Sequence, residues 1–138
     1  LKKNDKLIED IWKVNVMGPW NLTRAAWEPL ASSKMGRIVV IVSMSGKRSK
    51  GNLAAYSMSK FALMGLCQTI RNEGWNKGIR ISAICPGWVN TDMASEVKSI
   101  SKKDMTQPEN LAELVNSLII LPNNCIPFEV ALTCNLET

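Results

Sequence analysis

The stretch Gly36-Arg37-Ile38-Val39-Val40-Ile41-Val42-Ser43 contains five consecutive β-branched residues. Such an unbroken run is typical of a strand buried on both faces, as in a parallel sheet, because a surface strand alternates apolar with polar residues. A buried strand needs a neighbouring strand on each side, and the residues before it in the chain predict none. The stretch therefore predicts an α/β fold whose first strand lacks a partner among the preceding residues.

Helical and strand patterns alternate on both sides of this stretch. Before it, Asp5 can cap a helix that runs to about Leu30, since apolar residues recur at three- and four-residue steps. After it, we expect a helix from Leu53, capped by Asn52 and ending near Gly74; a strand over Ile79–Cys85; a helix over Glu109–Leu121, with Pro108 in its first turn; and a strand over Phe128–Cys134. Between the second strand and the third helix, the polar segment Asn90–Gln107 predicts a mobile loop with short helical pieces. The order of elements predicts parallel strands, joined by right-handed crossovers, with helices on both faces of the sheet.

The composition narrows the classes of protein and of chemistry. Hydrophobic residues at 46% and charged residues at 21% match a soluble globular chain, and no apolar run approaches the ~18 residues that a membrane span needs. We therefore expect a cytoplasmic protein without a membrane partner. The chain has no histidine, which excludes Ser-His-Asp and Cys-His nucleophile systems and histidine-based zinc sites within it. The four cysteines form no C-x-x-C pair, so we expect reduced, mostly buried thiols and no metal.

The net charge of +5 permits a nucleic-acid partner without requiring one. The densest basic cluster, Lys47, Arg48 and Lys50, has no interleaved aromatic residues, which favours a solvated loop. We therefore expect no nucleic-acid partner. The sequence opens on Leu1 instead of Met and carries no signal segment, so we expect a piece of a longer chain.

Tyr56 and Lys60 stand four residues apart near the start of the predicted second helix. Residues four apart share one helix face, and a nearby cation favours the phenolate form of a phenol, which makes acid–base work near neutral pH feasible. Such a pair also occurs often by chance. Ser43 follows the first strand, at the edge where open α/β sheets bind ligands, although a serine can simply end a strand.

Two further positions carry both a structural and a functional interpretation. Pro19 has no N–H to bond the carbonyl of Asn15, so that carbonyl is free to accept from water at a helix kink. Pro86 and Gly87 end the second strand at the same edge as Ser43, with Thr91 shortly after them. There they can border a flat ligand or merely stop the strand.

Together these positions resemble the short-chain dehydrogenase/reductase family. The matching pieces, in the family's order and approximate spacing, are Val14-Asn15-Val16-Met17-Gly18, Gly36-Arg37-Ile38-Val39 leading to Ser43, Tyr56-Ser57-Met58-Ser59-Lys60, and Pro86-Gly87-Trp88-Val89-Asn90-Thr91. The resemblance implies a Rossmann-like, doubly wound parallel sheet, of which this chain would hold three strands and their flanking helices. It also implies an oxidoreductase that transfers a hydride between NAD(P)(H) and an alcohol or carbonyl substrate.

The resemblance assigns roles to individual residues. Tyr56 would be the general acid/base, Lys60 would support it and bond the cofactor ribose, and Ser43 would orient the substrate carbonyl. Asn15 would hold a water that links Lys60 to solvent. The cofactor-binding residues would be Tyr56, Lys60, Pro86, Gly87, Val89 and Thr91. Metal ligands are not implied.

One departure from the family pattern concerns the cofactor. The glycine-rich turn that seats a pyrophosphate after the first strand is absent. We therefore interpret residues 1–138 as the carboxyl-terminal portion of a single Rossmann-like domain, inactive without its amino-terminal, dinucleotide-binding half. The resemblance leans toward NADP(H) over NAD(H) and implies a homo-dimer or homo-tetramer. The alternative is a non-catalytic protein of the same fold, a cofactor sensor or scaffold.

Overall fold

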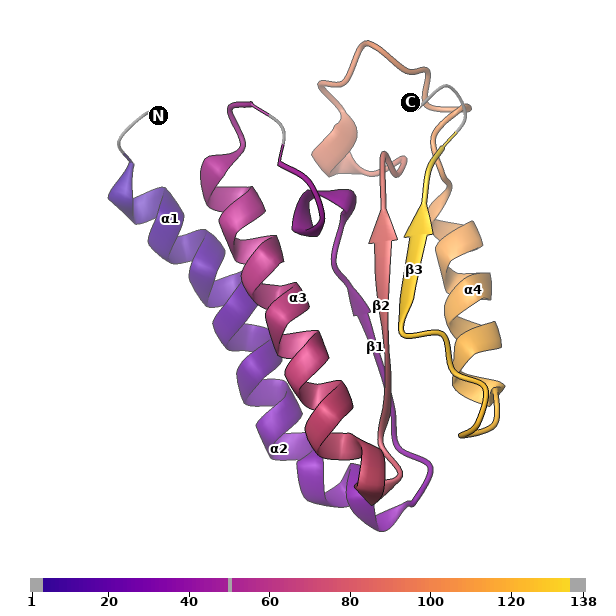
Figure 1. Cartoon of the computed structure of the whole chain (residues 1–138). Helices are drawn as coiled ribbons and strands as arrows, with labels where there is room; N and C mark the ends of the chain where they lie inside the picture. Colours follow the sequence, from indigo (N-terminus) through magenta and orange to yellow (C-terminus); the bar gives the residue numbers. More distant parts are fainter. Residues whose placement is uncertain (1–3, 50, 135–138) are drawn as a thin grey trace.

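The computed structural model describes residues 4–49 and 51–134, so Leu1 and Lys50 lie outside the described residues. The fold is a three-stranded parallel sheet in the order β1-β2-β3 with helices on both faces, as the sequence predicts. Figure 1 shows α1, α2 and α3 over one face and α4 over the other. The strands and long helices are α1 (Asp5–Trp12), α2 (Gly18–Ser32), β1 (Arg37–Ile41), α3 (Ala54–Gly74), β2 (Arg80–Pro86), α4 (Pro108–Ile120) and β3 (Glu129–Leu132).

The predicted first helix exists, with two differences. Its N-cap is Asn4, whose side chain accepts from the Leu7 N–H at 3.0 Å, so the prediction of Asp5 as the cap is wrong by one residue. Between α1 and α2 lies a π-helical segment, η1 (Lys13–Met17), in which the Gly18 N–H bonds the Lys13 carbonyl five residues back. The irregularity expected near Asn15 is thus a wider helical turn.

The predicted second helix exists over Ala54–Gly74 and ends at the predicted residue, but its N-cap and its left-handed glycine differ from the prediction. Its N-cap is Leu53, without a side-chain cap, and Asn52 stands outside with a φ of 64°, so Asn52 is not the cap. The helix continues past Gly74 into a 3-10 turn, η3 (Trp75–Lys77). Gly74 has a helical φ of −82°, and the left-handed residue is Gly78 at 77°. The conformational freedom of glycine is therefore needed at Gly78.

The main core lies between the sheet and α3. Alternate residues of β2, including Ile81, Ala83 and Cys85, face the helix and are buried. Opposite them, α3 contributes buried side chains at helical spacing: Leu63, Met64, Cys67 and Ile70. This packing holds the first turns of α3 over the carboxyl ends of β1 and β2.

β1 was expected to be buried on both faces and flanked on both sides. Its residues are only partly buried, and Ile41 is 45% exposed. The reason is topological: among the described residues, β1 pairs with β2 alone. The β-branched run therefore marks a strand with one open edge in this chain.

The segment between β2 and α4 contains more structure than the sequence suggests. It holds a 3-10 turn, η4 (Asp92–Ala94), and its Ala94, Ile100 and Met105 form a small apolar cluster with Cys134, which follows β3. A bridge between Val89 and Thr106 fastens its two ends. The predicted short helical piece is present as η4, and its residue Ala94 belongs to this second apolar cluster.

Two arginines sit side by side at the amino end of the sheet, because the register pairs Arg37 with Arg80. Arg37 donates to the Leu121 carbonyl at 2.6 Å and to Asn123 Oδ1 at 2.7 Å, and Arg80 donates to the Asn123 carbonyl at 3.0 Å. Burial and the charge of Arg80 lower the pKa of Arg37. The arginines thus fasten the connection between α4 and β3 onto the first two strands.

No helix in the described ranges has the length and apolar character needed to cross a membrane.

The turn at Gly78 gives a test of the fold. A Cβ at Gly78 would lie 2.5 Å from the Lys34 carbonyl oxygen, and φ is positive there. Gly78→Ala should therefore lower the free energy of unfolding by about 1–3 kcal/mol in urea titrations.

Gly65 is the matched control for this change. It lies inside α3, and a Cβ added there would meet no atom within 4 Å, so Gly65→Ala should raise the free energy of unfolding by about 0.5–1 kcal/mol. Equal effects of the two substitutions would contradict the described turn.

Candidate active site

Ser43 stands two residues after β1, in a backbone conformation that only glycine adopts readily, with φ 137° and ψ 156°. Local bonds hold it: its Oγ accepts from the Ser45 N–H at 3.0 Å, and its carbonyl accepts from the Gly46 N–H at 3.0 Å. Such a conformation costs about 1–3 kcal/mol and persists only where the surroundings enforce it, often at functional sites. The strained backbone therefore marks Ser43 as a candidate functional residue.

Gly46 explains how the Ser43 turn reaches α3. A Cβ at Gly46 would lie 2.8 Å from the Lys60 carbonyl oxygen and 2.6 Å from Val42 Cγ1. The 3-10 turn η2 (Met44–Gly46) therefore rests directly on the backbone of α3. This close approach sets the spacing between Ser43 and the first turns of α3, and our sequence reasoning missed it.

Tyr56 and Lys60 share a face of α3, as predicted. The Lys60 Nζ lies 5.6 Å from the centroid of the Tyr56 ring and donates to the Ile41 carbonyl, at the end of β1, at 3.2 Å. Burial lowers the pKa of Lys60. A partly desolvated ammonium next to a phenol is an arrangement that can stabilise a phenolate.

Asn15 reaches the same region from the π-helical segment. Its Nδ2 donates to Ser59 Oγ at 3.0 Å, and Ser59 Oγ donates to the Tyr56 carbonyl at 2.7 Å. The predicted residue thus contacts the turn of α3 that carries Tyr56 and Lys60. It does so through Ser59, to which the sequence analysis gave no role.

The residues predicted to border a nicotinamide follow β2. Pro86 is the buried last residue of the strand, and the Gly87 N–H donates to the Leu132 carbonyl at 2.8 Å. Val89 forms the bridge to Thr106, and Thr91 is exposed. The parallel register puts the end of β2 beside the end of β1, where Ser43 lies.

The loop after Ser43 was expected to be solvated. Lys47 and Arg48 are indeed exposed, and Lys47 also forms an ion pair and hydrogen bond with Glu129, the first residue of β3. This bond raises the pKa of Lys47. The pair connects the loop after β1 to the third strand.

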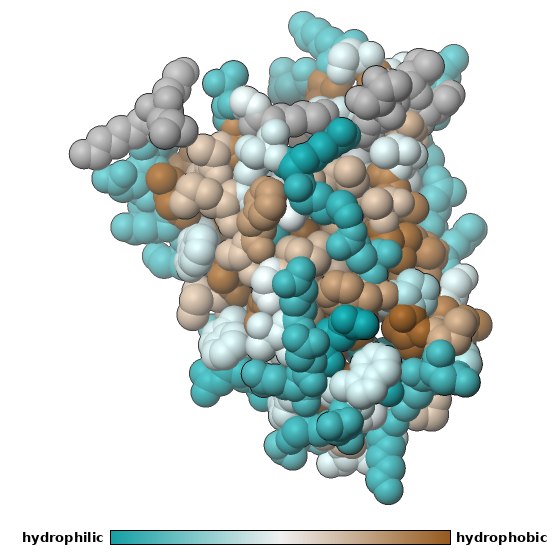
Figure 2. Space-filling model, in the orientation of Figure 1, coloured by the Kyte–Doolittle hydropathy of each residue, from teal (hydrophilic) through white to brown (hydrophobic). Residues whose placement is uncertain are grey.

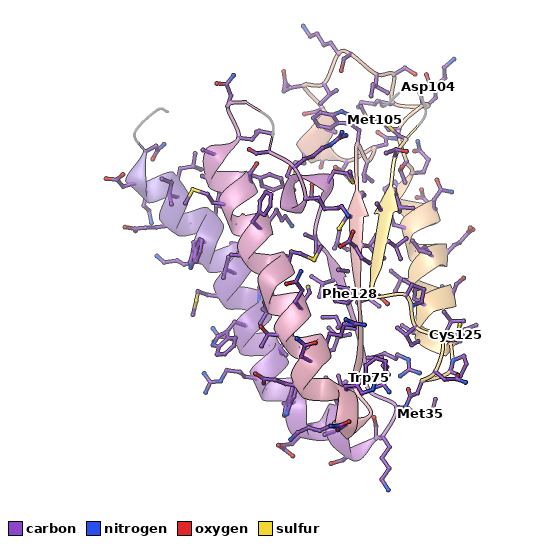
Figure 3. All side chains as sticks on the ribbon, in the orientation of Figure 1. Met35, Trp75, Asp104, Met105, Cys125 and Phe128 are labelled. Atoms are coloured by element: carbon purple, nitrogen blue, oxygen red, sulfur yellow. The ribbon has the colours of Figure 1, made fainter. Side chains whose placement is uncertain are left out.

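Two surface hollows lie elsewhere, both lined by Trp75 and Asn76. Figure 3 places Trp75, Met35 and Cys125 at one end of the sheet and Met105 at the other. The hollows therefore lie away from Ser43, at the amino end of the strands, where Arg80 stacks on Trp75 at 3.8 Å. In the described part of the chain, no cluster of three or more acidic or cysteine side chains could hold a metal ion.

Comparison with known proteins agrees with this arrangement. The family model "short chain dehydrogenase" matches residues 1–102. An agropine synthesis reductase of Rhizobium rhizogenes is 37% identical over 127 residues, which cover 92% of this chain and 30% of that protein. The chain thus spans about a third of the length of that relative.

Solved structures share the fold. A 4-hydroxyisoleucine dehydrogenase complexed with NADH superposes with a TM-score of 0.81 and 28% identity, over 96% of this chain and 60% of that one. A protein of Escherichia coli assigned as a short chain dehydrogenase, complexed with NADPH, gives a TM-score of 0.83 and 26% identity, over 96% and 55%. With the family model matching 102 of 138 residues, the chain belongs to the short-chain dehydrogenase family of oxidoreductases.

Proposed function

We propose that this chain carries the catalytic half of an NAD(P)(H)-dependent oxidoreductase acting on an alcohol/carbonyl pair, with Tyr56 as general acid/base. The observation that supports this most is the convergence of Ser43, Tyr56 and Lys60 at the carboxyl edge of the sheet. It is accompanied by a strained backbone at Ser43 and a lowered pKa at Lys60. A fold kept only as a scaffold has no need to maintain either feature.

A nicotinamide dinucleotide fits the donors present. An ammonium has three N–H donors, and in the described part of the chain Lys60 directs one of them to the Ile41 carbonyl. Its other donors could bind the ribose hydroxyls of the cofactor. The exposed Thr91 hydroxyl and the Gly87 backbone offer further polar contacts at the same edge. When bound, the nicotinamide ring would supply or accept the hydride.

The chain's own residues would handle the proton and the substrate. The Tyr56 Oη would give a proton to the carbonyl oxygen during reduction and take it back during oxidation. The Lys60 ammonium would stabilise the phenolate left behind, and the Ser43 Oγ would hold the substrate oxygen. Asn15, through its main-chain carbonyl, would hold a water that returns the proton to solvent. Positioned acid–base action of this kind contributes ~10²–10⁴ in rate.

We also infer that residues 1–138 form the carboxyl-terminal portion of a single domain. The open edge of β1 and the coverage of only 55–60% of the solved relatives support this inference. The relatives were solved with NADH and with NADPH, so the preference for NADP(H) stays a prediction. A cytoplasmic location stays a prediction as well.

An exposed apolar surface supports a homo-oligomer. It is formed by α1, η1, α2 and the start of α3, and Figure 2 shows apolar residues exposed in the upper left of the view, where α1 and α3 lie. Val14 is 71% exposed and Leu22 is 72% exposed. The remaining members are Leu7, Ile8, Trp12, Met17, Trp20, Leu53, Met58 and Phe61. A second copy of the chain would remove this surface from water.

The catalytic proposal is tested with the Tyr56→Phe variant of the protein that includes the upstream residues. Loss of the acid/base should lower kcat/KM for carbonyl reduction by ~10²–10⁴, while the unfolding midpoint stays near wild type. Residues 1–138 alone should neither bind dinucleotide in calorimetric titration nor turn over substrate. Near-normal reduction by Tyr56→Phe would overturn the mechanism, and dinucleotide binding without turnover in the unmodified protein would favour the sensor or scaffold.

The buried ammonium of Lys60 predicts a dependence of stability on pH. Its pKa is lowered in the folded protein, so between that value and the ordinary value near 10.5 the unfolded chain binds more protons than the folded one. The free energy of unfolding of the wild type should therefore rise with pH across this window relative to Lys60→Met. Denaturant titrations of both proteins at several alkaline pH values measure the difference, and a constant difference would contradict burial of the charge.

The oligomer is tested with Val14→Glu combined with Leu22→Glu. An unpaired buried carboxylate costs several kcal/mol, so the association constant should fall by ~100-fold or more, seen by light scattering as a smaller mass. Met35→Glu is the control, because Met35 is 59% exposed in the turn before β1, away from this surface. Equal masses for the wild type, the double variant and Met35→Glu would show that α1 and α2 do not form the interface.

A further inference from the structure

The hydroxyl of Ser59 joins two segments that are far apart in the sequence. Ser59 is fully buried, at 0% exposed, and makes two hydrogen bonds. It donates to the carbonyl of Tyr56, three residues earlier in α3, and accepts from Asn15 Nδ2, in the π-helical segment η1. This hydroxyl therefore bridges the turn of α3 that carries the candidate acid/base and the turn that carries the candidate proton relay.

The number of protons fixes the direction of this bridge. A serine hydroxyl has one proton and two lone pairs, and the proton is committed to the Tyr56 carbonyl at 2.7 Å. Only the lone pairs remain for Asn15, so the amide must present its NH₂ group and not its oxygen. The orientation of the Asn15 side chain is thus determined by Ser59.

The segment that carries Asn15 needs such an anchor. A π-helical turn is rare, at well under 1% of residues, and occurs mostly as a single wide turn within an α-helix. Within η1, Val14 and Met17 are exposed, and Asn15 is the residue whose side chain bonds to α3. The bond to Ser59 thus holds the Asn15 backbone in place over the α3 turn.

We propose that Ser59 is a positioning residue, which fixes the place of Asn15 relative to Tyr56 and thereby the path of the proton. It touches neither substrate nor cofactor, and the assignment rests on the proposed function of Tyr56. Its effect on the reaction is carried by Asn15 and by the Tyr56 backbone. Loss of its hydroxyl should impair proton return more than substrate binding.

Ser57 provides a matched control two residues away on α3. It is also buried, at 3% exposed, but its Oγ has no hydrogen-bond partner. Ser57→Ala and Ser59→Ala therefore remove the same atom from the same helix at similar burial. Only the second removes the bridge.

The kinetic test compares both variants in the protein that includes the upstream residues. Ser59→Ala should lower kcat about tenfold with KM within about twofold, and should shift the acid–base limb of the pH–rate profile, whereas Ser57→Ala should change neither. Ser59→Cys, which is close in size but a weak hydrogen-bond partner, should fall between Ser59→Ala and wild type. An unchanged pH–rate profile in Ser59→Ala would overturn the positioning role, even if its unfolding midpoint falls.

A second readout does not depend on activity. The side-chain amide protons of Asn15 should exchange slowly with solvent in the wild type and in Ser57→Ala, and faster in Ser59→Ala, as followed by NMR. Unchanged exchange in Ser59→Ala would overturn the bridge itself. If the wild type reduces no carbonyl, the proposed function fails, while this exchange measurement still decides whether Ser59 holds Asn15.

Discussion

The parallel register between β1 and β2 is the constraint on which the rest of the molecule depends. It aligns Ile41 with Ile84, so both strands end at the same edge, and the segments that follow them emerge side by side. Burial of alternate residues of β2 against Leu63 and Cys67 then fixes α3 above that edge. Once these two surfaces are joined, Ser43, the α3 turn that carries Lys60 and the residues after Pro86 all lie toward the same edge of the sheet.

Most of the fold could be predicted from the sequence because its signals are local and repeated. Apolar spacing and β-branched runs extend over many residues, so three parallel strands and their helices follow from them. The helix ends were less predictable, because Asn4 and Asp5 are both able to cap and only one backbone geometry is realised. Likewise Gly74 and Gly78 both suit a helix end, and the 3-10 turn between them places the left-handed conformation at the second.

The same difference between local signals and long-range packing separates the site residues that could be predicted from those that could not. The spacing of Tyr56 and Lys60 is a property of one helix, and Ser43 follows a strand, so both could be predicted. The bond between Asn15 and Ser59 joins residues 44 positions apart, and the contact between Gly46 and Lys60 depends on the distance between a turn and a helix. Packing of this kind leaves no periodic signal in a single sequence, which is why Gly46, Ser59 and the Lys47–Glu129 pair were missed.

The π-helical segment also determines where the length of the first helical stretch can change by one residue. A π turn holds one residue more than an α turn, and each α-helical residue rotates the following face by about 100°. Because the wide turn takes up the extra residue, deleting one residue from Lys13–Met17 would restore a regular helix and leave the side chains of α2 in their present directions. A deletion inside α2 has no such wide turn to absorb it and would rotate every later side chain of that helix by about 100°.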